Sequence, residues 1–171
     1  MAPKLTTASH IVLGLVEFAQ PASPYELKEL AARSVASFWA LPHTQIYAQV
    51  DRLLDAGLIS EKREETGRRR RELSITPAGR KALDKWRAEQ PAEHYELRDE
   101  SVLKIFFGAD PLAIAEQQIP QHEERLRYYE SVEEIADQLT EGQRLALEIG
   151  LGHEREYLRF WKQLIKRNGA A

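Results

Sequence analysis

Short polar side chains gather immediately after Pro42, at the expected start of a helix. They are His43, Thr44, Gln45, Tyr47 and Gln49. In the DNA major groove an amide such as that of Gln45 can bond adenine through two hydrogen bonds, and Thr44 can contact a thymine methyl group. Tyr47 and His43 can donate hydrogen bonds to phosphate or lie along the groove wall. These residues predict a DNA recognition helix, and the alternative is an ordinary polar helix surface.

A run of four arginines comes further along the chain, directly after Gly67. The four are Arg68, Arg69, Arg70 and Arg71. Consecutive guanidinium groups repel one another unless a polyanion neutralises them, and phosphate or a narrow minor groove supplies that negative charge. We expect two or three of the four to contact DNA and to make binding sensitive to salt. The alternative is a solubilising surface turn that neighbouring glutamates partly neutralise.

The periodicity of apolar residues predicts the elements that hold these side chains in place. Helices are expected over residues 9–19 and 24–35, the second started by a serine cap and a proline. The helix after Pro42 places Ile46, Val50 and Leu53 on one face, and Gly57 ends it. Residues 58–64 and 70–76 alternate apolar and polar side chains, which predicts a hairpin, and a further helix follows. This order is that of a winged helix-turn-helix DNA-binding domain, expected over residues 1–90.

Residues 91–171 are expected to form a second, helical domain that dimerises the protein. Apolar stripes at spacings of three and four cover residues 111–139 and 141–167, and Pro120 is expected to kink the first of these helices. A homodimer would place two recognition helices about one DNA turn apart on a pseudo-palindromic operator. The alternative is a helical bundle within one chain. The predicted fold class is therefore mainly α with a small β-hairpin wing.

The charge of the chain is unevenly distributed. The formal net charge is −3, but residues 1–88 carry +4, residues 89–148 carry −10 and residues 149–171 carry +3. The basic first part attracts phosphate, and the acidic part is expected to face away from DNA.

Several classes of protein are disfavoured by what the sequence lacks. The chain contains no cysteine, which excludes disulfides and thiolate metal sites. Its five histidines show no metal-ligand spacing, and neither a phosphate-binding glycine loop nor a nucleophile elbow is present. We therefore expect no enzyme activity, no metal and no cofactor. Because no signal peptide or membrane span is evident, a cytoplasmic protein without a membrane partner is expected.

Three segments together resemble the PadR family of bacterial transcriptional regulators. SHIVLGLVEFAQPASPYELK is similar to the opening helices of that family, FWALPHTQIYAQVDRLLDAGLI to its recognition helix, and GRRRRELSITPAGRKAL to its wing and fourth helix. Two positions depart from the pattern: Pro24 stands where a glycine is usual, and Leu73 where an aromatic residue is frequent. The resemblance implies a transcriptional regulator, more often a repressor than an activator, with a helical C-terminal dimerisation region.

The resemblance also implies a small effector, since some relatives bind phenolic acids or flat hydrophobic drugs. Candidate residues in this chain are His122, Tyr129, His153 and Trp161. We expect an aromatic carboxylic acid to bind between the domains and to change the separation of the recognition helices. The alternative is that these side chains belong to the core. A different class of function also stays open, in which the winged helix is a protein-interaction module without specific DNA binding.

Overall fold

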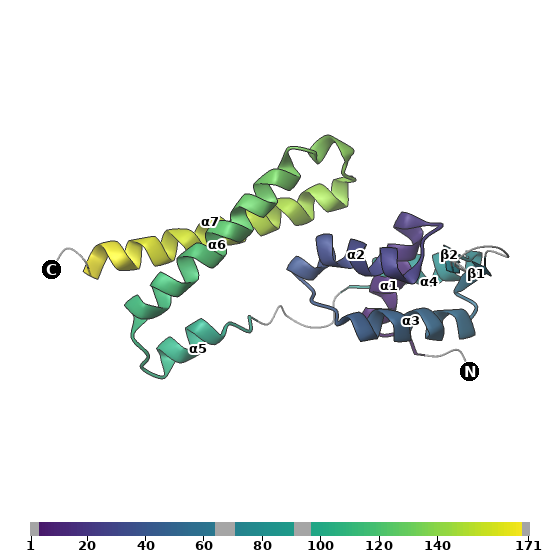
Figure 1. The fold of residues 1–171 in the computed structure, drawn as a ribbon, viewed down its shortest axis with the longest axis horizontal. Helices are drawn as coiled ribbons and strands as arrows, with labels where there is room; N and C mark the ends of the chain where they lie inside the picture. Colours follow the sequence, from purple (N-terminus) through teal and green to yellow (C-terminus); the bar gives the residue numbers. More distant parts are fainter. Residues whose placement is uncertain (1–3, 64–70, 91–96, 169–171) are drawn as a thin grey trace. The chain divides into compact units, whose positions relative to one another are not determined.

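The computed structural model describes residues 4–63, 71–90 and 97–168 of the 171-residue chain. The chain divides into two compact units, Met1–His94 and Tyr95–Ala171. The described residues are mainly helical, with a single two-stranded hairpin in the first unit (Figure 1). The fold class is therefore the one that the sequence predicts.

The first unit has the element order of a winged helix. In chain order its elements are α1 (Thr7–Ala19), α2 (Pro24–Arg33), the 3-10 helix η1 (Val35–Ser37), α3 (His43–Asp55), β1 (Ile59–Arg63), β2 (Arg71–Ile75) and α4 (Pro77–Ala88). Hydroxyl side chains cap three of these helices: Thr6 caps α1, Ser23 caps α2 and Thr76 caps α4. Each cap satisfies a backbone N–H that a helix start leaves without a partner.

The core of the first unit is formed where α1, α2, α3, α4 and the hairpin meet. Each element contributes side chains that are almost completely buried: Val12, Val16, Leu27, Ile46, Val50, Leu53, Leu73 and Leu83. Burying one such side chain stabilises the fold by about 1.5–3 kcal/mol relative to exposure in water. The apolar stripe of α3 is thus held inside the unit, and its opposite face is turned outward.

The hairpin is tied to the rest of the unit on both sides. Strand β1 pairs antiparallel with β2, and Ile59 lies opposite Ile75. The second edge of β2 bonds the segment between α1 and α2, because Ala22 and Leu73 exchange backbone hydrogen bonds of 3.2 and 2.9 Å. Gly57 adopts the left-handed conformation that ends α3 and redirects the chain into β1. These bonds fix the base of the hairpin relative to α3.

The carbonyl of Leu58 anchors the start of α4 beside the start of β1. Its oxygen accepts hydrogen bonds from the backbone N–H of Thr76, at 3.1 Å, and from the Thr76 hydroxyl, at 3.0 Å. Helix α4 approaches so closely that a Cβ atom on Gly79 would lie 2.0 Å from this oxygen. Only glycine therefore fits at position 79.

In the second unit, α6 and α7 pack against each other in antiparallel fashion. The elements are α5 (Glu100–Phe106), α6 (Pro111–Glu133), the 3-10 helix η2 (Ala136–Gln138) and α7 (Glu141–Asn168). Tyr129 of α6 covers Gly150 of α7, and Leu147 and Leu151 join the same cluster. Glu123, earlier in α6, pairs with Lys162, later in α7, at 2.7 Å.

Two features of this unit differ from the sequence prediction. The helix expected over 111–139 ends at Glu133, and Ala136 begins a separate 3-10 turn. Helix α5 was not predicted, since seven residues are too few to show a helical period. Its start is nevertheless encoded locally, because Asp99 accepts hydrogen bonds from the N–H groups of Ser101 and Val102.

Substitution of Gly79 by alanine is expected to destabilise the first unit by roughly 3 kcal/mol, because the new methyl group overlaps the Leu58 carbonyl. The matched control is Gly14→Ala in α1, where a Cβ meets nothing within 4 Å. This control should stabilise the helix by about 0.5–1 kcal/mol, since alanine is the better helix former. Urea unfolding followed by circular dichroism measures both. Equal stabilities for the two variants would contradict the close approach of α4 to Leu58.

Candidate nucleic-acid interface

Helix α3 presents a polar face to solvent along its first three turns. His43, Thr44 and Gln45 are exposed, and the side chain of Tyr47 is 40% exposed. The opposite face carries Ile46, which is completely buried. Four of the five recognition-helix candidates therefore lie on a surface that a partner can reach.

A residue that the sequence analysis passed over lies in the middle of this face. Ala48 is exposed and follows Thr44 by one helical turn. A methyl group here allows close approach of the helix to a partner surface, and it can itself contact an apolar group such as a thymine methyl.

Helix α3 starts without a capping side chain. The cap position is occupied by Pro42, which has no polar group to offer, whereas α1, α2 and α4 are capped by hydroxyls. The N–H group of Gln45 bonds the Pro42 carbonyl at 2.9 Å, whereas no side chain caps the N–H groups of His43 and Thr44. These two groups therefore rely on solvent or on a bound anion, and the helix dipole favours an anion at this end.

The start of α2 adds an aromatic and a basic side chain to the same region. Tyr25 is 59% exposed, and the ammonium group of Lys28 lies 4.5 Å from the centre of its ring. Lys28 also forms an ion pair of 2.8 Å with Glu29, and this hydrogen bond raises the pKa of the lysine above its usual value. Lys28 of α2 and His43 of α3 line the same pocket, so the two helices share this surface. Neither α2 residue was proposed from sequence, because their spacing alone fits an ordinary helix surface.

Gln49 lies differently from the other recognition-helix candidates. Its amide oxygen accepts a 2.7 Å hydrogen bond from the hydroxyl of Ser9, a residue that is completely buried. This oxygen therefore faces α1 and the interior of the unit rather than a groove of DNA. The prediction placed Gln49 with Gln45 opposite the apolar stripe of the helix, but position 49 falls at the edge of that stripe.

Arg71 is held by carboxylates of its own unit. Its Nε donates to Glu61 at 2.9 Å, and its Nη2 donates to Asp51 of α3 at 3.1 Å. Arg63 also pairs with Glu61, and hydrogen bonds from Arg63 and Arg71 lower the pKa of that carboxyl group despite its desolvation. Arg71 thus bridges the hairpin and α3. The other three arginines of the run, Arg68, Arg69 and Arg70, lie outside the described residues.

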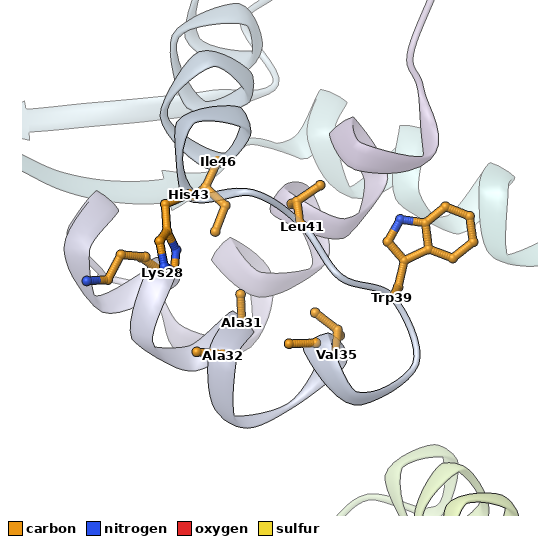
Figure 2. Close-up of a pocket in the computed structure, with 9 residues that line it drawn as sticks. Lys28, Ala31, Ala32, Val35, Trp39, Leu41, His43 and Ile46 are labelled. Atoms are coloured by element: carbon orange, nitrogen blue, oxygen red, sulfur yellow. The ribbon is translucent and has the colours of Figure 1, made fainter. Parts of the chain in front are cut away.

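A small pocket opens between α2, η1 and the start of α3. Its volume is about 70 Å³, and its walls are mainly apolar, formed by Ala31, Ala32, Val35, Ala36, Leu41 and Ile46. Lys28 and His43 lie at one end, and Trp39 lies at the other (Figure 2). The pocket therefore combines an apolar floor with two basic groups next to the start of α3.

Three of the four effector candidates of the second unit are engaged in helix packing. Tyr129 is buried against α7, and Trp161 is 1% exposed. His122 is hydrogen bonded through Nδ1 to Glu154, a buried carboxylate on α7. The ring of His153, which is exposed, is tilted against that of Tyr157 on the same helix, with ring centres 4.5 Å apart. Tyr129, Trp161 and His122 are therefore buried or paired within the second unit, as the alternative in the sequence analysis proposes, whereas His153 lies on the exposed surface of α7.

Metal and membrane sites were also sought in the described parts of the chain. No three His, Asp or Glu side chains gather there as metal ligands. No helix among the described residues has the length and apolar character needed to cross a bilayer.

The two glutamines of α3 are expected to differ when each is changed to alanine. Gln49→Ala should lower the free energy of unfolding by about 1–2 kcal/mol, because Ser9 loses a buried hydrogen-bond partner. Gln45→Ala is the matched control on the same helix, and its exposed side chain should leave stability within about 0.5 kcal/mol of wild type. Thermal unfolding compares the variants. A loss in Gln45→Ala that equals the loss in Gln49→Ala would refute this division of roles.

Comparison with known proteins identifies relatives of both the sequence and the fold. Residues 12–85 match the transcriptional regulator PadR-like family. The chain is 25% identical over 100 residues to the negative transcriptional regulator PadR of Bacillus subtilis (strain 168), which covers 57% of this chain. The match spans about half the length of that relative, 54%.

Solved structures extend the similarity from the first unit to nearly the whole chain. The structure of Bacillus subtilis PadR in complex with operator DNA superposes with a TM-score of 0.81 at 20% identity, covering 95% of this chain and 99% of that one. The same protein in complex with p-coumaric acid gives a TM-score of 0.73 at 19% identity, covering 95% and 97%. The relatives compared are transcriptional regulators and not enzymes. Residues 12–85 are therefore similar to the transcriptional regulator PadR-like family, and the chain has the fold of the PadR structures over 95% of its length.

Proposed function

We propose that this protein is a sequence-specific DNA-binding transcriptional regulator that acts as a homodimeric repressor. Helix α3 enters the major groove, and the start of α2 lies against the phosphate backbone. Such an arrangement is the usual docking geometry of a helix-turn-helix, in which the second helix contacts base edges.

The observation that carries the proposal is the division of α3 into a buried and an exposed face. Three completely buried side chains, Ile46, Val50 and Leu53, fix the helix in the core. Because these buried side chains set the orientation of α3 about its axis, Thr44, Gln45 and Tyr47 on the opposite side are exposed. A protein-interaction module would require the buried stripe only. The exposed side chains are short, polar and suited to base edges and phosphate, which favours DNA.

Backbone contacts are assigned to the uncapped start of α3 and to Tyr25. The N–H groups that Pro42 leaves uncapped are suited to a phosphate oxygen. His43 lies at this helix start, where it can donate to the same anion. The phenolic hydroxyl of Tyr25 can donate to a neighbouring phosphate. We also assign phosphate contacts to Arg68, Arg69 and Arg70 on the basis of their charge.

The homodimer is supported by apolar side chains that α6 and α7 leave uncovered. The stripes of these two helices are largely used within one chain, since Leu147, Leu151 and Leu158 are buried. Outside that seam, Ile149 is 74% exposed and Phe106 is 80% exposed. Exposed apolar groups of this size favour burial by a second copy. Two recognition helices per dimer suit a pseudo-palindromic operator.

Repression and location follow from the kind of protein proposed. The curated relative is a negative regulator, and a dimer that occupies promoter DNA blocks transcription without any enzymatic step. A regulator of this type works where the chromosome lies, and we therefore place it in the cytoplasm.

Removal of the exposed α3 side chains is expected to abolish specific DNA binding. Gln45→Ala and Tyr47→Ala should each weaken binding to a selected duplex by about tenfold or more, because a good base contact contributes about 1–3 kcal/mol. Fluorescence anisotropy against a duplex selected from a random library measures the loss, with excess nonspecific DNA present.

Two controls accompany this measurement. Lys81→Ala, an exposed charge on α4, should bind the selected duplex as wild type does. Light scattering should show that all variants keep the same oligomeric state. If the α3 variants bind as tightly as Lys81→Ala, the winged helix serves a partner other than DNA.

We further propose that a flat aromatic carboxylic acid is the effector of this regulator. A relative of the same fold has been solved with p-coumaric acid. In this chain the pocket between α2 and α3 has the required chemistry, an apolar floor with Lys28 and His43 at one end (Figure 2). An apolar cavity of about 150 Å³ accommodates benzene, so a ring requires this pocket to widen. Trp39, which is half exposed at the other end, is the side chain that moves.

Opposite effects are expected from two neighbouring substitutions at this pocket. Lys28→Met removes the cation and should weaken release of DNA by p-coumarate severalfold. Glu29→Gln removes the carboxylate that pairs with Lys28 at 2.8 Å and should make the same acid more effective. Duplex release is measured by anisotropy over a concentration series of p-coumarate, with p-coumaryl alcohol as the uncharged control. Equal responses in wild type and both variants would exclude this pocket as the effector site.

A further inference from the structure

We infer that Arg71 is a positioning residue, which joins the wing to the recognition helix through Asp51 and does not itself bind phosphate. The inference rests on the proposed function, since it concerns how DNA is bound. It separates Arg71 from the three arginines that precede it in the sequence.

The inner face of the hairpin changes from apolar to ionic along its length. Ile59 and Ile75 face the core at its base, and Glu61 lies opposite Leu73 on the next inward rung. The next rung on the same face pairs Arg63 with Arg71, and the side chain of Arg63 is 69% exposed. The side chain of Glu61 is only 12% exposed, so its charge requires a close partner.

Arg71 supplies that partner and extends the contact to α3. Its Nε and Nη2 groups both lie within 2.9 Å of Glu61 Oε2, and Nη2 lies 3.1 Å from Asp51 Oδ1. A planar guanidinium can bond two carboxylates at once in fixed directions, which a lysine cannot do. The hairpin and the third turn of α3 are therefore joined by one side chain.

The position of Asp51 gives this bridge a consequence for DNA binding. Asp51 follows Tyr47 by one helical turn and Thr44 by two, on the exposed face of α3. An unpaired carboxylate there repels phosphate. Paired with Arg71, it is neutralised, and the group comprising Asp51, Glu61, Arg63 and Arg71 has no net charge. The contact between the wing and α3 therefore carries no net charge.

For the effect of Asp51→Ala on DNA affinity, the bridge predicts the opposite of what the change in net charge alone would predict. Loss of a negative charge near phosphate should tighten binding, and alanine is a better helix former than aspartate. If Asp51 serves to hold the wing, Asp51→Ala instead weakens binding, by about three- to tenfold. Arg71→Gln weakens it by a similar factor, and neither change alters the dependence of affinity on salt.

The test measures the affinity of the full chain for a duplex selected by the wild-type protein, at several salt concentrations. Asp51→Ala is compared in three backgrounds: wild type, Arg71→Gln and Arg63→Gln. We expect it to weaken binding in wild type and in Arg63→Gln, but to have no further effect in Arg71→Gln. Arg63→Gln is the matched control, because Arg63 lies across from Arg71 and bonds Glu61, but among the described residues only Arg71 of this pair also bonds α3.

Two results would overturn the inference. The first is a tightening of DNA binding by Asp51→Ala. The second is a fall of about one in the salt slope for Arg71→Gln, as expected when one phosphate contact is lost. Far-UV circular dichroism confirms that each variant is folded.

A measurement without DNA separates this inference from the proposed function. Hydrogen exchange of the peptide covering residues 59–63 should be faster in Asp51→Ala and in Arg71→Gln than in wild type. Unchanged exchange would show that the bridge does not hold the hairpin. A wild-type protein that selects no duplex, with exchange altered as expected, would instead reject the proposed function and the role of the bridge in DNA binding.

Discussion

The arrangement of the first unit depends on how α3 is held in the core. Ile46, Val50 and Leu53 enter the same apolar cluster as side chains of α1 and α2, and this contact sets the rotation of the helix about its axis. Rotation by one residue would bury polar groups and expose apolar ones at a cost of several kcal/mol. The exposed face of α3 is therefore determined by the buried one. The hairpin, which begins directly after the helix, takes its position from the same contact.

The sequence predicted those parts of the fold that local rules determine. The starts of α2 and α4 follow from a hydroxyl residue before proline, and both capping serine and capping threonine bond the expected N–H groups. The face of α3 followed from the spacing of apolar residues. Helix α5 was not predicted, because it is too short to show a helical period. The end of α6 was predicted too late, because polar and apolar residues continue at helical spacing beyond Glu133.

The candidate site was less predictable, since side chains of one type can have different partners. Gln45 and Gln49 are residues of one type on the same helix, but the second bonds buried Ser9. Arg71 belongs to a run of identical residues, and only the strand register shows that it lies beside Glu61 and Asp51. Tyr25 and Lys28 were missed because their proximity to α3 is a tertiary contact. Such contacts have no signature in the spacing of residues along the chain.

The absence of a capping side chain on α3 has a consequence for the energetics of recognition. A side-chain cap contributes about 1 kcal/mol to a helix, and α3 lacks this contribution where α1, α2 and α4 have it. In the free protein the first turn of α3 is therefore the helix start of this unit with the least local support. A phosphate group bound at that end would supply the missing acceptor, so that the nucleic acid itself completes the helix that recognises it. Part of the free energy of the phosphate contacts would then be used to order the first turn of α3. The measured affinity for DNA would therefore be weaker than the contacts alone would give.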